Sequence, residues 1–180
     1  MIGLILSLAL AGQTVSAPEE SRVKGSSAER TIAEFLDVCV RPRFDVPSMQ
    51  KAVARSDFAY QPQSSSTPSA TSFRWRATRA VLALEVGPGV EQITAQCALS
   101  VGSIQPRSGS QIAAMMKPAL EAELGYPVAV KVLNDQAEIG WAEKGAPFRY
   151  RITLVGSATQ PHQAQWYALD RLPNVGRTTK

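Results

Sequence analysis

Two similar tetrapeptides offer the residues best suited to bind an anion. Residues 73–76 and 148–151 each alternate an aromatic residue with an arginine. Alternate side chains of a strand point to opposite faces, so each segment would present its arginines on one face. If the two strands are neighbours, four guanidiniums form a candidate anion-binding face for a carboxylate, a phosphate or an anionic glycan. The alternative is a solvated face whose arginine stems cover apolar surface. The four residues are Arg74, Arg76, Arg149 and Arg151.

Ser48 and Lys51 have the S-x-x-K spacing that places a serine nucleophile and a lysine base one helical turn apart. The companion S-D-N and K-T-G patterns are absent from the sequence. A chain with this many serines is expected to contain such a match by chance. We therefore interpret Ser48 as a helix N-cap and Lys51 as a surface residue.

Other residue types that support catalysis lack the partners they would need. His162 is the only histidine, and the sequence contains neither H-E-x-x-H nor C-x-x-C. Asp135 and Glu138 are three positions apart, which places them on opposite faces of a strand. Gly87-Pro88-Gly89 lacks the third glycine and the following helix of a dinucleotide site, so it predicts a turn. We expect no metal, no cofactor and no catalytic residue.

The two cysteines, Cys39 and Cys97, predict one disulfide. No motif of a reactive thiol surrounds either residue, and an exported chain would meet an oxidising compartment. In the chain-entropy model, a loop of this length stabilises the folded state by roughly 4 kcal/mol.

The N-terminus predicts export. Residues 1–17 contain no charged side chain, Ile2 begins an apolar run, and small residues precede a cleavage site near Ala17. The run is shorter than the about 20 residues that span a bilayer. The alternative is a buried N-terminal helix or strand. We expect a cleaved signal peptide, a periplasmic or secreted protein, and no transmembrane segment.

Composition narrows the class of partner. The formal net charge is +4, and the lysines and arginines do not form the runs typical of nucleic-acid tails. Arginines outnumber lysines and alanine is abundant, which suggests a bacterial origin. We expect no nucleic-acid partner.

Helical spacing of apolar residues predicts three helices. The first contains Ile32 and Cys39 on one stripe and follows Ser26 as N-cap. The second covers residues 47–55, with Asp45 or Ser48 as its N-cap. The third covers 110–124, with a kink or break at Pro118 and a left-handed C-cap at Gly125.

Alternation of apolar and polar residues predicts the strands. The strongest segment, 90–101, carries Cys97 on its apolar face and forms a hairpin with 73–86, which has a bulge or bend near 77–79. After the third helix, about four more strands are expected. They cover 128–132, 137–141, 148–154 and 163–169, with a turn at Asn134-Asp135.

These elements predict an α+β domain. N-terminal helices and one central helix would pack on a mostly antiparallel sheet of about five or six strands, which could curve. The expected organisation is a signal peptide at 1–17, a disordered segment at 18–28, and a single domain at 29–172. That domain contains a Ser/Pro-rich loop at 61–72, and a flexible tail follows at 173–180.

The sequence therefore predicts an exported, small, non-enzymatic protein that binds a partner or associates with the cell envelope. Its partner would be an anionic envelope component or another protein. The alternative is a small secreted hydrolase with a pocket under the sheet. An enzyme should show an ionisable residue in a concave pocket, whereas a binding protein should show a filled core and a broad surface patch.

Overall fold

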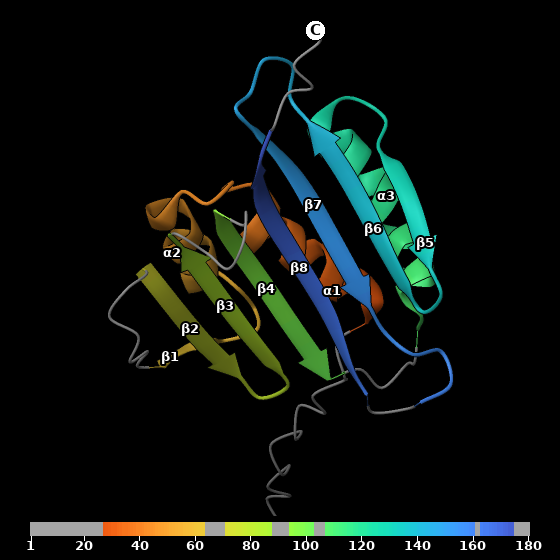
Figure 1. The fold of residues 1–180 in the computed structure, drawn as a ribbon. Coiled ribbons are helices and arrows are strands. Elements are labelled where there is room, and N and C mark those ends of the chain that lie inside the picture. The colour runs from red at the N-terminus through yellow and green to blue at the C-terminus, as the bar shows by residue number, and fades with distance from the viewer. Residues whose placement is uncertain (1–26, 64–70, 88–93, 103–106, 161–162, 175–180) are drawn as a thin grey trace, which may run out of the picture.

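Eight antiparallel strands form one sheet, and helices cover one of its faces (Figure 1). The computed structural model describes residues 27–63, 71–87, 94–102, 107–160 and 163–174. An α+β fold with a sheet is confirmed, but the expected five or six strands were too few.

Three segments of the described chain are α-helical, and local capping sets their ends. They are α1 (Ala28–Phe35), which continues as the π-helical segment η1 (Leu36–Val40), α2 (Val46–Ala54) and α3 (Gly109–Leu124). Ser27, not Ser26, caps α1, and the Asp45 side chain accepts from the Ser48 backbone N–H at 3.0 Å. Helix α3 runs through Pro118 as one element and ends at Gly125 (φ 77°), the predicted C-cap.

The strands form two meanders that meet in the middle of the sheet. The first comprises β1 (Gln61–Gln63), β2 (Thr71–Ala77), β3 (Ala80–Val86) and β4 (Ala95–Gly102). The second comprises β5 (Ala129–Leu133), β6 (Gln136–Ala142), β7 (Phe148–Val155) and β8 (Ala164–Pro173). Their order is β1-β2-β3-β4-β8-β7-β6-β5, so the last strands of the two meanders pair with each other. α1, η1 and α2 precede the first meander, and α3 precedes the second. The described chain therefore consists of two halves of similar design.

The undercount of strands has two physical causes. The phase change at 77–79 is a hairpin turn between β2 and β3, not a bulge, and Thr78-Arg79 lacks the glycine or asparagine that usually marks one. Gln61–Gln63 form β1 inside the segment predicted as a loop, and Thr71 and Ser72 belong to β2. The remaining residues of that loop, 64–70, lie outside the described residues.

The predicted segments at the two ends are described only in part. The predicted signal peptide and most of the segment 18–28 fall outside the described residues, and Ala28 already belongs to α1. Pro173 still belongs to β8, and residues 175–180 of the predicted tail are not described. Within the described ranges, no helix is long and apolar enough to cross a membrane.

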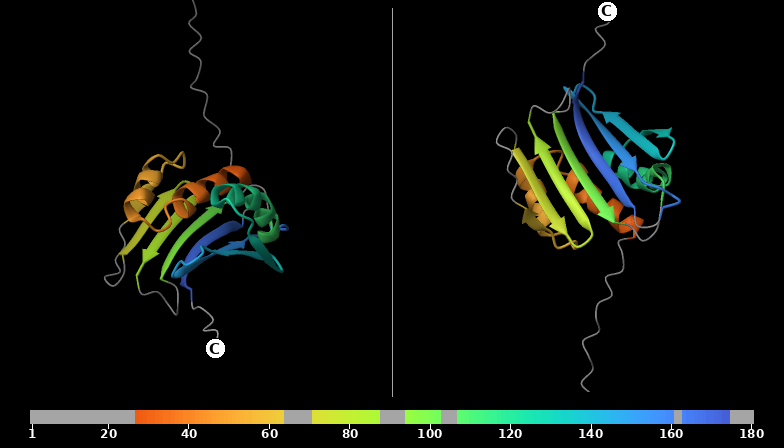
Figure 2. Two further views of the ribbon diagram at one scale, coloured as in Figure 1. Left: turned by 90° about the horizontal axis from the view of Figure 1, so that it is seen from above. Right: turned by 60° about the horizontal axis from the view of Figure 1, so that its bottom comes forward.

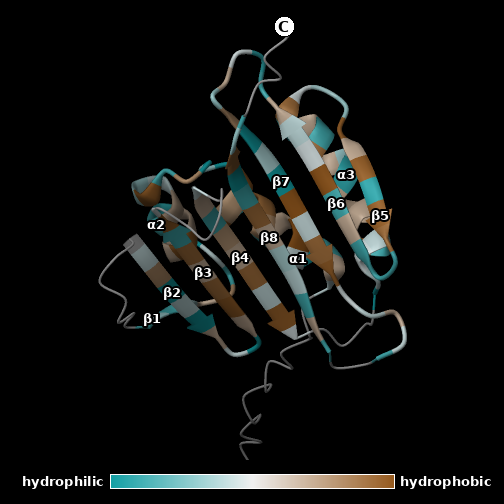
Figure 3. Ribbon diagram, viewed as in Figure 1, coloured by the Kyte–Doolittle hydropathy of each residue, from teal (hydrophilic) through white to brown (hydrophobic). Residues whose placement is uncertain are grey.

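The core lies between the sheet and the helices. Figure 2 shows the helices on one side of a curved sheet, and Figure 3 shows apolar and polar residues alternating along its strands. Fully buried side chains of both layers fill the space between them. From the sheet they include Leu82, Leu84, Leu99, Ile139, Ile152 and Leu154, and from the helices Phe35, Met49, Ile112, Met116 and Leu120.

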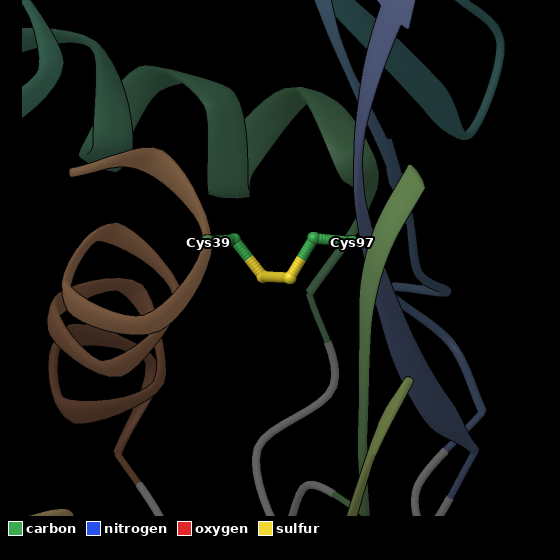
Figure 4. The surroundings of a disulfide bond; sticks show 2 residues. All are labelled: Cys39 and Cys97. Carbon is green, nitrogen blue, oxygen red and sulfur yellow. A yellow bond between two sulfur atoms is a disulfide. The ribbon is translucent and has the colours of Figure 1, made fainter. Parts of the chain in front are cut away.

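A disulfide joins the two layers in the first half. Cys39 of η1 and Cys97 of β4 point toward each other across the core (Figure 4), with sulfurs 2.00 Å and Cα atoms 5.6 Å apart. Both residues are fully buried. The predicted pairing is therefore present, and it fastens the N-terminal helix to the central strands.

Candidate functional site

The face of the sheet opposite the helices carries no helix in the described part of the chain, and we call it the open face (Figure 2). Directly paired residues of adjacent strands share a face, so the register identifies its members. The middle row runs from β2 to β5 through Arg74, Ala83, Ala98, Ala168, Thr153, Glu138 and Lys131.

All four arginines of the two tetrapeptides lie on the open face, but they form two separate pairs. Three strands, β3, β4 and β8, separate Arg74 and Arg76 on β2 from Arg149 and Arg151 on β7. Four strand spacings correspond to about 19 Å. Since β2 and β7 are not neighbours, the four guanidiniums cannot all bind the same small anion.

Only Arg151 of the four is held by a described partner. Its Nε and one terminal nitrogen donate to Oδ2 of Asp170 at 3.2 and 2.8 Å. Gln96 donates to the other oxygen of that carboxylate at 2.8 Å. Asp170 is 3% exposed, so the carboxylate of this pair is shielded from solvent, whereas the Arg151 side chain is 38% exposed. Within the described ranges, Arg74, Arg76 and Arg149 make no such bond.

Trp166 lies on the open face of the central strand β8, two residues from the middle row, toward the edge where β7 ends and β6 begins. It is 40% exposed, whereas Ala98 and Ala168 expose only 4% and 2%. Its neighbours across the strands are Ser100 and Val155. A large aromatic beside a floor of small side chains can insert into an apolar depression of a partner.

A hollow of about 520 Å³ lies on the open face over β5–β8, and we call it the Gly140 hollow. Gly140 has no side chain, and Ala129, its neighbour on β5, has a small one. Three cationic side chains and one carboxylate line the hollow, beside apolar residues. They are Lys131, Arg149, Arg151 and Glu138, with Ala129, Ala142 and Leu172.

A second hollow, of about 660 Å³, lies between α1–η1 and α2 and contains a buried carboxyl group. Glu34 is 8% exposed and accepts from the Ser56 hydroxyl at 2.6 Å. Burial raises the pKa of Glu34, and the Ser56 hydroxyl opposes that shift. Burial and the neighbouring Glu34 carboxyl raise the pKa of Tyr60. Glu34 is thus an ionisable residue in a concave site, as expected of an enzyme, but this site lies on the helical side of the molecule.

The other residues considered for chemistry do not assemble into a site. Ser48 lies in the first turn of α2, and its hydroxyl and backbone N–H lower the pKa of Asp45, which caps that helix. Lys51 is exposed on the same helix. Asp135 is in the β5–β6 turn, where its carbonyl accepts from Gly109 N–H at 2.7 Å, whereas Glu138 faces the open side.

His162 and most of the Gly87-Pro88-Gly89 turn lie outside the described residues. The cysteine, aspartate and glutamate side chains in the described part of the chain form no group of three or more that could hold a metal ion.

Sequence patterns did not single out Trp166, Asp170, Gly140 or Glu34. The alternation of β8 contains a signal for the first two, because Tyr167 and Leu169 occupy its buried face and place Trp166 and Asp170 on the other. Glu34 precedes Phe35 and Leu36 of the apolar stripe, so helical periodicity alone places it at the margin of the buried face. Its hydrogen-bond partner, Ser56, follows α2 and lies far away in sequence, so helical periodicity could not reveal that contact.

No protein-family model, curated protein or solved structure matches this chain.

Proposed function

We propose that this is an exported, non-enzymatic binding protein that uses the open face of its sheet to bind a macromolecular partner. The observation that supports this most directly is an eight-stranded face without a described helix, bearing an exposed Trp166 on its central strand β8. Arg74, Arg76 and Arg149 add positive charge without described partners. Tryptophan and arginine are the residue types most enriched at the energetic centres of protein interfaces.

The size of the open face suits a macromolecule better than a small ligand. Seven strand spacings make it roughly 34 Å wide, and strands of this length make it roughly 20 Å high. The resulting area of about 700 Å² approaches the about 800 Å² that each partner contributes to a standard interface. The partner would be an anionic envelope component or a protein with acidic groups at its rim.

Export is part of the proposal, and the buried disulfide supports it because such bonds persist in oxidising compartments. Mass spectrometry of the protein recovered from the periplasm or medium tests this. We expect cleavage after Ala17 and a mass two hydrogens below that of the reduced chain. Retention of residues 1–17, or two free thiols, would contradict export.

Retention on columns that carry anionic glycans or cell-envelope fragments tests the binding surface. We expect Trp166→Ala to weaken retention at least tenfold. Replacing Arg74 and Arg76, or Arg149 and Arg151, with Gln should lower both retention and its dependence on salt. The matched control is Lys51→Gln with Arg55→Gln, which removes the same charge from α2. Retention that none of the open-face variants changes would contradict the proposal.

A small hydrolase is the second candidate, and the buried Glu34 carboxyl is the observation that favours it. A carboxyl group with a raised pKa, next to a hydroxyl and inside a hollow, resembles a general acid in its environment. Against this candidate, fully buried apolar side chains fill the space between sheet and helices. Turnover of an ester or glycoside that Glu34→Gln abolishes would support it, and turnover unaffected by this substitution would remove Glu34 from the mechanism.

A further inference from the structure

We propose that the Gly140 hollow is a binding site for one carboxylate carried on a short apolar stem, such as a glutamate side chain. This inference deepens the proposed function, because it assigns the anionic part of the ligand to one end of the open face. It rests on the proposed function only for the source of the carboxylate. The existence of the site and its preference for a carboxylate are argued from the geometry and charge of the hollow.

The hollow exists because two adjacent strands carry their smallest side chains opposite each other. Gly140 of β6 pairs with Ala129 of β5 on one side and with Arg151 of β7 on the other. A Cβ atom at Gly140 would meet nothing closer than the Tyr150 carbonyl oxygen at 3.9 Å. The chain could therefore accommodate a side chain here, and its absence leaves room for a ligand.

The two arginines of the hollow are suited to hold a carboxylate between them. Arg149 and Arg151 lie on the same face of one strand, about 7 Å apart along it. The buried Asp170 carboxylate binds two of the nitrogens of Arg151 and so fixes the guanidinium in one orientation. The remaining terminal nitrogen of Arg151 and the whole guanidinium of Arg149 make no hydrogen bond within the described part of the chain. An incoming carboxylate would thus meet donors that are partly ordered in advance.

The lining favours a single negative charge with an apolar stem. Glu138 and Asp170 offset part of the positive charge of Lys131, Arg149 and Arg151, which disfavours a dianion such as phosphate more than a carboxylate. Ala129, Ala142 and Leu172 supply apolar contacts for methylene groups. Leu172 pairs directly with Arg149, so the apolar wall adjoins the cation.

The test is a nuclear magnetic resonance titration of the full chain that follows the arginine Nε–H signals. The probes are sodium acetate, sodium phosphate and a glutamate pentapeptide blocked at both ends. We expect saturable shifts of the Arg149 and Arg151 signals with the peptide and with acetate, and weaker binding of phosphate. Absence of a saturable shift with either carboxylate would overturn the proposal, and tighter binding of phosphate would overturn the preference for a carboxylate.

Two variants distinguish specific binding in the Gly140 hollow from nonspecific attraction of the peptide to positive charge. Gly140→Val fills the hollow without changing its charge, and Arg149→Gln removes a donor; each should weaken peptide binding at least tenfold. Replacing Arg74 and Arg76 with Gln removes more charge from the same face but should leave peptide binding within twofold. An unfolding transition at the wild-type temperature establishes that each variant is folded. Equal weakening by the distant arginine pair would overturn the proposal.

The two proposals can fail separately. Carboxylate binding at the hollow, together with retention that no open-face variant changes, would leave this site standing and contradict the proposed function. Retention that depends on Trp166 and Arg74, with no saturable shift of the Arg149 and Arg151 signals, would support the proposed function and contradict the carboxylate site.

Discussion

The two halves of the molecule share one design but are fastened differently. In the first, helices precede the β1–β4 meander, and the Cys39–Cys97 disulfide ties η1 to β4. In the second, α3 precedes the β5–β8 meander and packs on β5–β7 without a covalent link. The comparison shows that the same arrangement of helix and sheet can be stabilised by a cross-link or by close packing.

Close packing in the second half depends on a glycine. Gly109, at the start of α3, lies so near the sheet that a Cβ atom would be 2.3 Å from the Leu154 carbonyl oxygen and 2.7 Å from that of Asp135. Its N–H donates to the Asp135 carbonyl at 2.7 Å. Ile112, Met116 and Leu120 then bury their side chains fully against the sheet. Steric fit at the start of α3 thus takes the place of the covalent bond.

Loss of the disulfide should have the largest effect on stability. Replacing Cys39 and Cys97 with Ala opens a loop with a sequence separation of 58 residues and should lower the free energy of unfolding by about 4 kcal/mol. Chemical denaturation measures this, and reduction of the wild-type protein is the control because it breaks the same bond. A loss below about 1 kcal/mol would show that the first half, too, is held mainly by packing.

Gly109→Ala should be the next most disruptive change. The added methyl group collides with backbone atoms that cannot move without shifting the sheet, so we expect a loss of about 3 kcal/mol. Gly140→Ala is the matched control, because its Cβ atom has no contact closer than 3.9 Å and should change stability by less than about 1 kcal/mol. Similar losses in the two variants would contradict the role given to close approach.

Removing a helix N-cap should lower the free energy of unfolding by a smaller amount, and by different amounts for α3 and α1. Ser108 accepts from the Gln111 N–H, and the Gln111 side chain accepts from the Ser108 N–H at 2.9 Å. Ser27 makes only the first kind of bond, accepting from the Arg30 N–H at 3.2 Å. We expect Ser108→Ala to cost about 1 kcal/mol and Ser27→Ala less, measured by denaturation. The reverse order would show that the reciprocal cap adds nothing to α3.

The halves should also respond differently to pH. Burial raises the pKa of Glu34 on α1, whereas the buried residues of α3 are not ionisable. Between the ordinary pKa of glutamate and this raised value, the folded state binds more protons than the unfolded state, so the free energy of unfolding falls as pH rises. Glu34→Gln should remove this fall and stabilise the protein most at neutral pH. Stability curves that run parallel from pH 3.5 to 8 would contradict the assignment.

Local patterns predicted the elements, whereas tertiary contacts decided the candidate site. Alternation identified the strand containing Cys97, the apolar stripe identified α1, and Gly125 marked the end of α3. The order of strands depends on pairings between distant segments, such as β4 with β8. For that reason the sequence placed four arginines on strands but could not show that β2 and β7 lie apart. The burial of Asp170 depends on Gln96 and Arg151, which come from other strands.

The pairing of β4 with β8 has a consequence for the order in which the chain folds. Both cysteines lie in the first of the two halves, so the disulfide could close before the second half has folded. The strand β4 would then be anchored before its last partner exists. β8, the last strand in the described part of the chain, would complete the sheet by adding to an edge whose position is already fixed. An early cross-link would in this way act as a template for late assembly.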